Sequence, residues 1–317
     1  MDKKTAIVLG CSGQDGSLLA KSLLKKGVKV IGLTRSKQNQ IKNHIKLGIN
    51  KDIEIKEGDI NSPTAIKYLL DHYEPDFLFN LAAQSSVGKS FGHPAETLKS
   101  IISGTLNILE IARERNYAGK LFFAGSSEMF GDTEKPAEIT HEQKPMSPYG
   151  IAKQTSYNLV KFYREVYHLS CVTGVLFNHE SNLRNDNFVI PKIINSAFNI
   201  KNNNFRQRIK FGNINIIRDW GWAPDYVEAM QLITESKKLQ DHVVCSGKPH
   251  TLKVFIEKVF SKFELNWEDH IEIDQSLFRK QEINISYGSP DLLFKELGWK
   301  TKENLSSIIN KLTDHLT

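Results

Sequence analysis

Four polar residues near the middle of the chain are spaced in a way that suits acid–base chemistry. Ser126 and Glu128 follow a run of apolar residues, and Tyr149 and Lys153 come directly after Pro148. Proline favours the first turn of a helix, so Tyr149 and Lys153 should lie one turn apart on the same helix face. A lysine there would lower the pKa of the tyrosine, and a phenolate can take a proton from an alcohol. Such a pair also occurs by chance on many helices, so this interpretation needs a nucleotide-binding turn elsewhere.

A glycine-rich turn near the start of the chain meets that need. Gly10, Gly13 and Gly16 stand between the apolar run Thr5–Leu9 and a helical pattern. Glycines at this spacing allow a tight turn and let the backbone approach a pyrophosphate at a helix N-terminus. The alternative is a glycine-rich turn with no special function. The turn predicts dinucleotide binding by Gly10, Gly13, Gln14, Asp15 and Gly16.

The ends of the next three apolar runs extend this prediction. Lys29–Leu33 is followed by Arg35, which favours the 2′-phosphate of NADP over the ribose of NAD, unless it is simply solvated. Asp59 follows Ile53–Glu57 and suits either an adenine contact or a helix cap. After Phe77–Asn80 come small residues that let the backbone lie along a cofactor, Leu81, Ala82 and Ala83. Two serines that suit substrate contacts or helix caps follow, Ser85 and Ser86.

Apolar runs and helical patterns alternate through the first half of the chain, which predicts a doubly wound parallel sheet. A helix is expected over Leu98–Arg113 and a strand over Ser170–Phe177, after which the alternation becomes irregular. A chain of 317 residues can hold one large α/β domain and a smaller one. We expect the first over residues 1–177 and the second over 178–317. A helix over Asp225–Leu239 and a strand over Asp241–Cys245 should rejoin the first domain.

The composition is that of a soluble globular protein, with 40% hydrophobic and 25% charged residues. The net charge of +6 could indicate nucleic acid, two anionic nucleotides or a lysine-rich composition bias, but no nucleic-acid-binding motif is present. No apolar run approaches the length of a membrane span, and no secretory segment is evident. Three cysteines lie far apart without metal-like spacing, so we expect no metal site and a cytoplasmic location: Cys11, Cys171 and Cys245.

Taken in order, these motifs resemble the extended short-chain dehydrogenase/reductase family, which implies a Rossmann-type fold. Over nearly the whole chain, longer segments look like the GDP-mannose 4,6-dehydratase family: GCSGQDGSLLA, NLAAQSSV, GSSEMFG, SPYGIAK, VLFNHES and RDWG. The resemblance implies an NADP-dependent enzyme that converts GDP-mannose to GDP-4-keto-6-deoxymannose, with a GDP-sugar-binding C-terminal α/β domain. The alternatives are the same reaction on GDP-manno-heptose or a GDP-N-acetylhexosamine, a nucleotide-sugar reductase or epimerase, and a non-catalytic NADP-sensing protein.

The resemblance also implies roles for the four central residues. Tyr149 would take the proton of the sugar C4 hydroxyl, with Ser126 bonded to the same oxygen and Lys153 bonded to the nicotinamide ribose. Glu128, on the same side of an extended strand as Ser126, would remove the C5 proton and serve the leaving C6 hydroxyl. Reductases and epimerases of the family usually lack a carboxylate at this position. Ser127 stands where dTDP-glucose dehydratases typically carry aspartate, which favours a GDP-sugar.

Later positions match the family's nucleotide-sugar contacts. Asn178 would contact the diphosphate and Lys192 the nucleotide, although Pro191 replaces a frequent arginine and Arg184 could supply the charge instead. His179 and Glu180 are expected to stabilise a turn. Paired arginines suit a diphosphate because of their fixed charge and bidentate donors, although each could form an ordinary surface ion pair. The match assigns Arg218 and Arg279 to the diphosphate and Glu282 to the nucleoside.

The resemblance further implies a homodimer formed by the helices around Leu98–Arg113 and Tyr149–Tyr167. Tetrameric relatives often have a second arginine beside the one after the second strand. Here Thr34 and Ser36 flank Arg35, so a tetramer is possible but less favoured.

Overall fold

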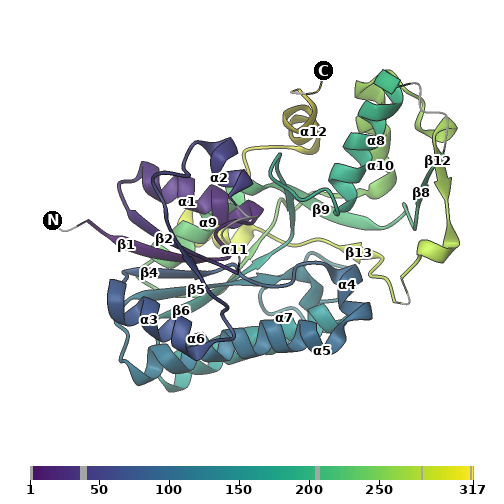
Figure 1. Cartoon of the computed structure of the whole chain (residues 1–317). Helices are drawn as coiled ribbons and strands as arrows, with labels where there is room; N and C mark the ends of the chain where they lie inside the picture. Colours follow the sequence, from purple (N-terminus) through teal and green to yellow (C-terminus); the bar gives the residue numbers. More distant parts are fainter. Residues whose placement is uncertain (1–2, 36–40, 204–207, 280, 315, 317) are drawn as a thin grey trace.

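The computed structural model describes residues 3–35, 41–203, 208–279, 281–314 and 316. The first five residues of the polar, lysine-rich segment expected over Ser36–Asn50 lie outside these residues, as do the first two of the basic run Arg206–Lys210. Figure 1 shows a large sheet with helices on both faces and a smaller group of elements beside it. No described helix combines the length and the apolar character that a membrane crossing requires.

The large sheet has seven strands in the order β3-β2-β1-β4-β5-β6-β10, and every neighbouring pair is parallel. The order runs outward from β1 in both directions, so the crossover connections lie on both faces of the sheet. This confirms the doubly wound Rossmann-type fold. The strands are β1 (Thr5–Leu9), β2 (Lys29–Thr34), β3 (Glu54–Glu57), β4 (Phe77–Asn80), β5 (Lys120–Ser126), β6 (Cys171–Leu176) and β10 (His242–Val244).

Alternate residues of each strand pack into one of two cores. On β1, Ala6 and Val8 face one core, and Ile7 and Leu9 face the other. The first core is covered by α1 (Gln14–Lys25), α9 (Ala223–Glu235) and α11 (Asp291–Leu297), with α2 (Lys42–Leu47) beside α1. The second is covered by α3 (Pro63–Tyr73), α6 (Gly104–Glu114) and α7 (Pro148–Val166).

The smaller group has its own apolar core, which includes the largely buried Trp220, Phe255 and Ile308. Around it lie α8 (Val189–Asn203), α10 (Leu252–Lys262) and α12 (Leu305–Thr313). One small sheet contains β7 (Asn178–Glu180), β9 (Ile217–Trp222), β11 (Pro249–Thr251) and β13 (Ile285–Ser286). A second contains β8 (Ile209–Phe211) and β12 (Ile271–Ile273).

The helix predicted over Leu98–Arg113 is confirmed, but part of it is π-helical. It consists of α5 (Pro94–Leu98), a π-helical turn (Lys99–Ser103) and α6, and the short helix α4 (Val87–Gly92) precedes it. The Ile101 carbonyl in this turn accepts the side-chain hydroxyls of Thr105, at 2.8 Å, and Ser156, at 3.4 Å. Side chains that compete for a backbone carbonyl in this way disturb the regular helix, and the periodicity of the apolar residues carries no sign of it.

Candidate active site

The glycine-rich turn joins β1 to α1 and packs directly against the chain that follows β4. Gly10 has a φ of +78°, and a Cβ atom there would lie 2.9 Å from the backbone nitrogen of Ala82. A Cβ atom on Gly16 would lie 2.2 Å from the Gly10 carbonyl oxygen. Both positions therefore require glycine. The result is a concave stretch of bare backbone at the N-terminus of α1, which suits a pyrophosphate.

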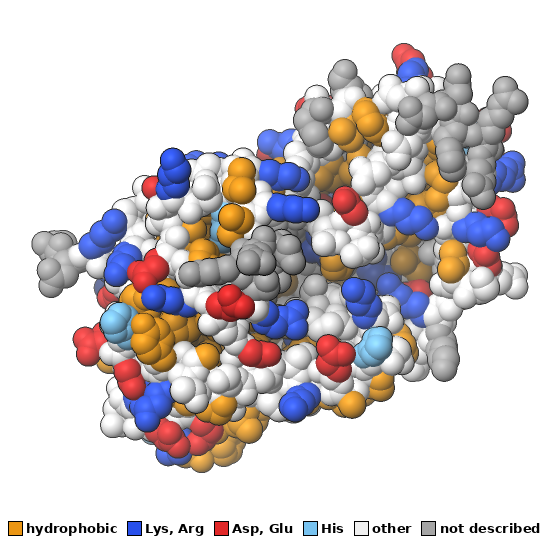
Figure 2. Space-filling view, viewed as in Figure 1, with side chains coloured by type: hydrophobic (Ala, Val, Ile, Leu, Met, Phe, Trp, Pro, Cys, Tyr) orange, Lys and Arg blue, Asp and Glu red, His pale blue; other side chains and the backbone are white. Residues whose placement is uncertain are grey.

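A cleft of about 740 Å³ runs along this turn. Lys42 and Lys46 of α2, which were not predicted, line it together with Arg35. The sequence did not show that α2 and the end of β2 line the same cleft. Figure 2 shows Lys and Arg side chains around the recess between the large sheet and the smaller group. The cleft is also lined by Ser85 and by the predicted cofactor residues Gly10, Gly13, Gln14, Asp15, Gly16, Arg35, Asp59, Leu81, Ala82 and Ala83.

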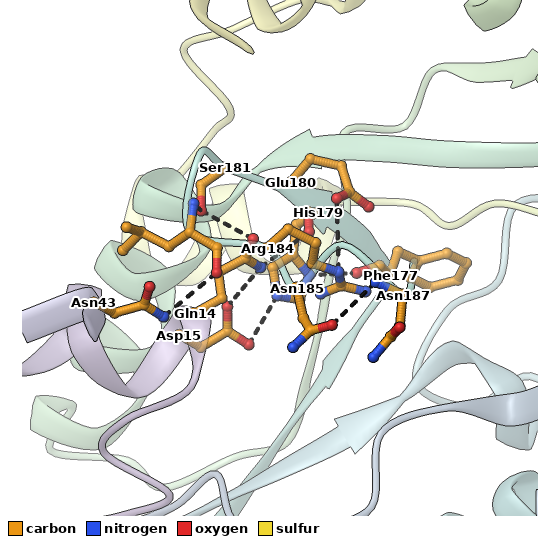
Figure 3. A network of polar contacts seen from close by, with 11 residues as sticks. Gln14, Asp15, Asn43, Phe177, His179, Glu180, Ser181, Arg184, Asn185 and Asn187 are labelled. Carbon is orange, nitrogen blue, oxygen red and sulfur yellow. Dashed lines mark hydrogen bonds and ion pairs between the residues drawn. The ribbon is translucent and has the colours of Figure 1, made fainter. Parts of the chain in front are cut away.

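A polar network connects β7 and the loop after it to the start of α1 (Figure 3). The Asp15 carboxylate lies 3.0 Å from His179 Nε2, and His179 Nδ1 lies 2.7 Å from the Phe177 carbonyl oxygen. Gln14 donates to the His179 carbonyl and accepts from the Ser181 hydroxyl. Burial alone would raise the pKa of Asp15, but the charges of His179 and Arg184 bring it down to about 2. The network therefore joins the cofactor turn to the smaller group.

The catalytic pair lies on α7, whose first turn is fixed by its cap. Ser147 accepts the backbone N–H of Gly150, and Pro148 follows it as the first helical residue. Lys153 Nζ donates to the Ala124 carbonyl at 2.7 Å and lies 5.7 Å from the centre of the Tyr149 ring. The predicted spacing thus brings both side chains to the end of β5.

The pKa of Tyr149 differs from the prediction. Burial raises it to about 12, although a hydrogen bond with Ser126 acts in the opposite direction. The expected lowering is wrong for the protein alone, because the burial of Tyr149 outweighs the groups that lower its pKa. Burial also lowers the pKa of Lys153, to about 8. The hydrogen bond does place the Ser126 and Tyr149 hydroxyls together. A shared alcohol ligand could therefore bond to both.

The prediction that Glu128 lies on an extended strand is wrong. Glu128 lies in a 3₁₀ turn (Ser127–Met129) that begins where β5 ends. The Ser126 hydroxyl caps this turn by accepting the Glu128 backbone N–H at 3.3 Å. The Glu128 side chain is half-buried. Burial raises its pKa, and the nearby charges of Arg218 and Arg279 oppose that rise. A carboxyl group with a raised pKa beside a serine and a tyrosine can serve as a base and then as an acid.

The two predicted arginines converge on one carboxylate. Glu282 Oε1 lies 3.3 Å from Arg218 Nη2 and 3.1 Å from Arg279 Nη1. Arg218 is deeply buried and also donates to the Ile217 carbonyl, while Arg279 is partly exposed. Glu282 therefore bridges the two arginines, which the sequence did not reveal. Its contact with a nucleoside stays a prediction.

The other predicted substrate residues lie in different places. Asn178 begins β7, which pairs with β9 beside Trp220. Lys192 lies over the ring of Phe211 and donates to the Lys210 carbonyl, so it does not join the arginine pair. Ser86 caps α4 by accepting the Lys89 N–H, the alternative role expected for it.

The described residues suit a nicotinamide dinucleotide and offer no comparable place for a metal. The bare backbone of the glycine turn suits the pyrophosphate of such a cofactor, and the cleft of about 740 Å³ has room for it. The cations Arg35, Lys42 and Lys46 in the lining of the cleft suit its negative charge. Among the residues that the structure describes, no group of three or more His, Cys, Asp or Glu side chains could hold a metal ion.

Comparisons with known proteins agree with this arrangement. GDP-mannose 4,6 dehydratase 1 from Arabidopsis thaliana is 40% identical over 323 residues, covering 98% of this chain and 89% of that protein. The Vibrio cholerae GDP-mannose 4,6-dehydratase is 31% identical over 348 residues, covering 98% and 93%.

The fold has solved counterparts as well. The structure of UDP-glucose 4-epimerase from Thermus thermophilus with NAD superposes with a TM-score of 0.87 at 22% identity, covering 98% of each chain. A family model described as GDP-mannose 4,6 dehydratase matches residues 7–312. The chain belongs to the GDP-mannose 4,6-dehydratase family.

Proposed function

We propose that this protein is an NADP-dependent GDP-mannose 4,6-dehydratase that forms GDP-4-keto-6-deoxymannose. The observation that carries the proposal is the meeting of two kinds of proton-transfer group at the end of β5. Tyr149 and Ser126 share a hydrogen bond there, and Glu128 follows in the next turn. The proposed division between 1–177 and 178–317 would put this chemistry on the cofactor domain and the arginine pair on the substrate domain.

Each residue has a distinct role in this reaction. When bound, the nicotinamide cofactor accepts a hydride and later returns it to the sugar. Tyr149 takes the proton of the C4 hydroxyl while Ser126 bonds the same oxygen. The buried Lys153 is near enough to stabilise the phenolate by its charge and to bond a cofactor ribose.

Glu128 carries out the elimination. The C4 ketone acidifies the C5 proton, which passes to the Glu128 carboxylate. The carboxylic acid then gives that proton to the C6 hydroxyl, so the C–O bond breaks, water leaves and a C5–C6 double bond forms. Glu128 then takes a proton from water and gives it to C5, which balances the C4 hydroxyl proton that Tyr149 removed and completes the product once the hydride has been returned to C6. A reductase or an epimerase does not eliminate water and needs no carboxylate for that purpose. The presence of Glu128 therefore favours the dehydratase over these alternatives.

The preference for NADP rests on positive charge at the end of the cleft. Arg35 follows β2, and Lys42 and Lys46 lie on the same wall. A 2′-phosphate would be attracted by all three, whereas a free ribose of NAD gains little from them. Replacing Arg35 with Ser should raise the Kd for NADPH about tenfold or more and leave that for NADH nearly unchanged.

We propose that the protein is cytoplasmic and forms a homodimer through the outer face of α6 and α7. Large apolar side chains are exposed on these helices or directly after them: Leu106, Ile151, Phe162, Val166 and Tyr167. Pairing with a second copy would remove this apolar face from water. A monomer at micromolar concentration in sedimentation would contradict the proposal, and a tetramer would require a second interface.

Incubation with GDP-mannose and catalytic NADP⁺, followed by mass spectrometry, tests the function. The proposal predicts a product lighter by one water without accumulation of NADPH. An unchanged GDP-mannose that nevertheless binds would indicate another GDP-sugar, of which GDP-manno-heptose and GDP-N-acetylhexosamines are the alternatives. A product of unchanged mass that differs from GDP-mannose in chromatography would instead favour an epimerase.

A further inference from the structure

The arginine pair lies against the turn that carries Glu128, although the two are far apart in sequence. Asp132, just after the turn, accepts the backbone N–H groups of Asn284 and Ile285 at 2.6 and 2.9 Å. Thr133 donates its backbone N–H to the Ile285 carbonyl. In turn, β13 pairs with β9 so that Ser286 lies opposite Arg218. The backbone contacts therefore bring the turn of Glu128 close to Arg218 and to the chain around Glu282.

The charges in the cluster around Glu128 nearly balance. Glu128 faces Arg218 from β9, Arg279 and Glu282 from the segment before β13, and the Tyr149 hydroxyl from α7. Arg218 also faces Asp132. With both glutamates ionised, two cations meet two carboxylates, and the carboxylate of Asp132 adds a further negative charge. Among the residues that the structure describes, the cluster therefore has no excess of positive charge with which to receive an anion.

A sugar-nucleotide diphosphate brings two negative charges to these arginines. In a site of low polarity, that charge opposes the ionised form of any neighbouring carboxyl group. Burial already disfavours the ionised form of Glu128, and the charges of Arg218 and Arg279 oppose that effect. An anion that engages the arginines weakens their support for the Glu128 carboxylate.

We propose that the diphosphate of the substrate, by binding Arg218 and Arg279, makes Glu128 a stronger base. The inference rests on the proposed function, since it needs a diphosphate on the arginine pair. The arginines thereby gain a second role, because they couple occupancy of the substrate site to the proton affinity of the group that attacks C5. A base whose proton affinity matches the working pH is most effective in the bound complex, where it is needed.

Binding-linked proton uptake measures this coupling directly. The protein would carry Tyr149→Phe to prevent turnover, be saturated with NADP⁺, and be titrated with GDP-mannose in a calorimeter. Buffers of different ionisation enthalpy report how many protons are taken up. The inference predicts net uptake, at most about one proton, over a pH range that lies above the usual titration range of a glutamate. Affinity should weaken as pH rises through this range, by at most about tenfold per pH unit.

Two variants identify the group that takes the proton. Adding Glu128→Gln to Tyr149→Phe should abolish the uptake while leaving binding intact. Adding Glu257→Gln instead, an exposed carboxylate of α10 paired with Lys253, should leave the uptake unchanged. Uptake that persists without Glu128 would overturn the inference, as would binding without any uptake in the Tyr149→Phe protein. Failure of GDP-mannose to bind at all would instead remove the proposed diphosphate site, and the inference with it.

Discussion

The two sides of the proposed active site differ in how the chain assembles them. The centre of the cofactor side is one continuous turn, Gly10–Gly16, and a residue pair on one helix, Tyr149 and Lys153, to which α2 and the ends of β2, β3 and β4 are added. The substrate side is assembled from β9, the segment before β13 and the turn after β5, which meet only in the folded protein. The cofactor side is therefore shaped by local backbone geometry, and the substrate side by charge balance between distant segments. Substitutions should affect the two sides in separable ways.

Removal of the Tyr149 hydroxyl should have the largest effect. Tyr149→Phe is expected to lower kcat by about 10²- to 10⁴-fold, because no other described side chain takes the C4 proton. Binding of the cofactor and of GDP-mannose should change little, as fluorescence or calorimetric titration would show. Tyr163→Phe is the matched control, since Tyr163 lies on the same helix but bonds to Glu110. Near-normal turnover by Tyr149→Phe would remove the proton-transfer role.

Loss of one arginine should weaken the substrate side alone. Arg279→Gln is expected to raise the Kd for GDP-mannose about 10- to 100-fold, the usual cost of losing a charge-assisted contact. Its partial exposure makes misfolding less of a concern than at the buried Arg218. Lys210→Gln, an exposed cation of the same group paired with Asp274, should have little effect. Equal losses in the two variants would mean that only general charge matters.

Crowding the glycine turn should weaken the cofactor side alone. Gly16→Ala places a Cβ atom 2.2 Å from the Gly10 carbonyl oxygen, so the turn must shift. The Kd for NADP is expected to rise about tenfold or more, since overpacking costs roughly 1–3 kcal/mol. Gly92→Ala, with nothing within 4 Å of the new atom, is the control. If the two variants bound NADP equally well, the close packing of this turn would have no role in binding.

Removal of the contact between Asp15 and His179, which joins the two sides, should have the smallest effect. Asp15 has a lowered pKa of about 2, so its carboxylate stabilises the fold above its unfolded value of 3.8 and ceases to do so as pH falls through about 2. Asp15→Asn should therefore cost about 1–2 kcal/mol of unfolding free energy at neutral pH. That difference should shrink between about pH 4 and pH 2 in denaturant titrations. Asp71→Asn, in an exposed ion pair with Arg115, should have little effect on the unfolding free energy.

What could be predicted from the sequence follows the same division. The parallel strands, the glycine turn and the helix that starts at Pro148 depend on residues close in sequence, and the expected strand ends differ from the observed ones by one or two residues. The 3₁₀ turn at Glu128 and the π-helical turn before α6 depend on hydrogen bonds that periodicity does not encode. The bridge from Glu282 to both arginines, and the contact of Asp15 with His179, depend on tertiary packing.

The central claim is that Tyr149 serves the C4 oxygen and Glu128 serves the elimination. The most direct test is a single turnover of the Glu128→Gln variant with NADP⁺ and GDP-mannose, followed by absorbance of the reduced cofactor. Oxidation at C4 should proceed and then stop, so that reduced cofactor accumulates to about one equivalent per active site, because the C5 proton has no acceptor. Full turnover to the 6-deoxy product, or no oxidation despite bound substrate, would contradict this division of labour.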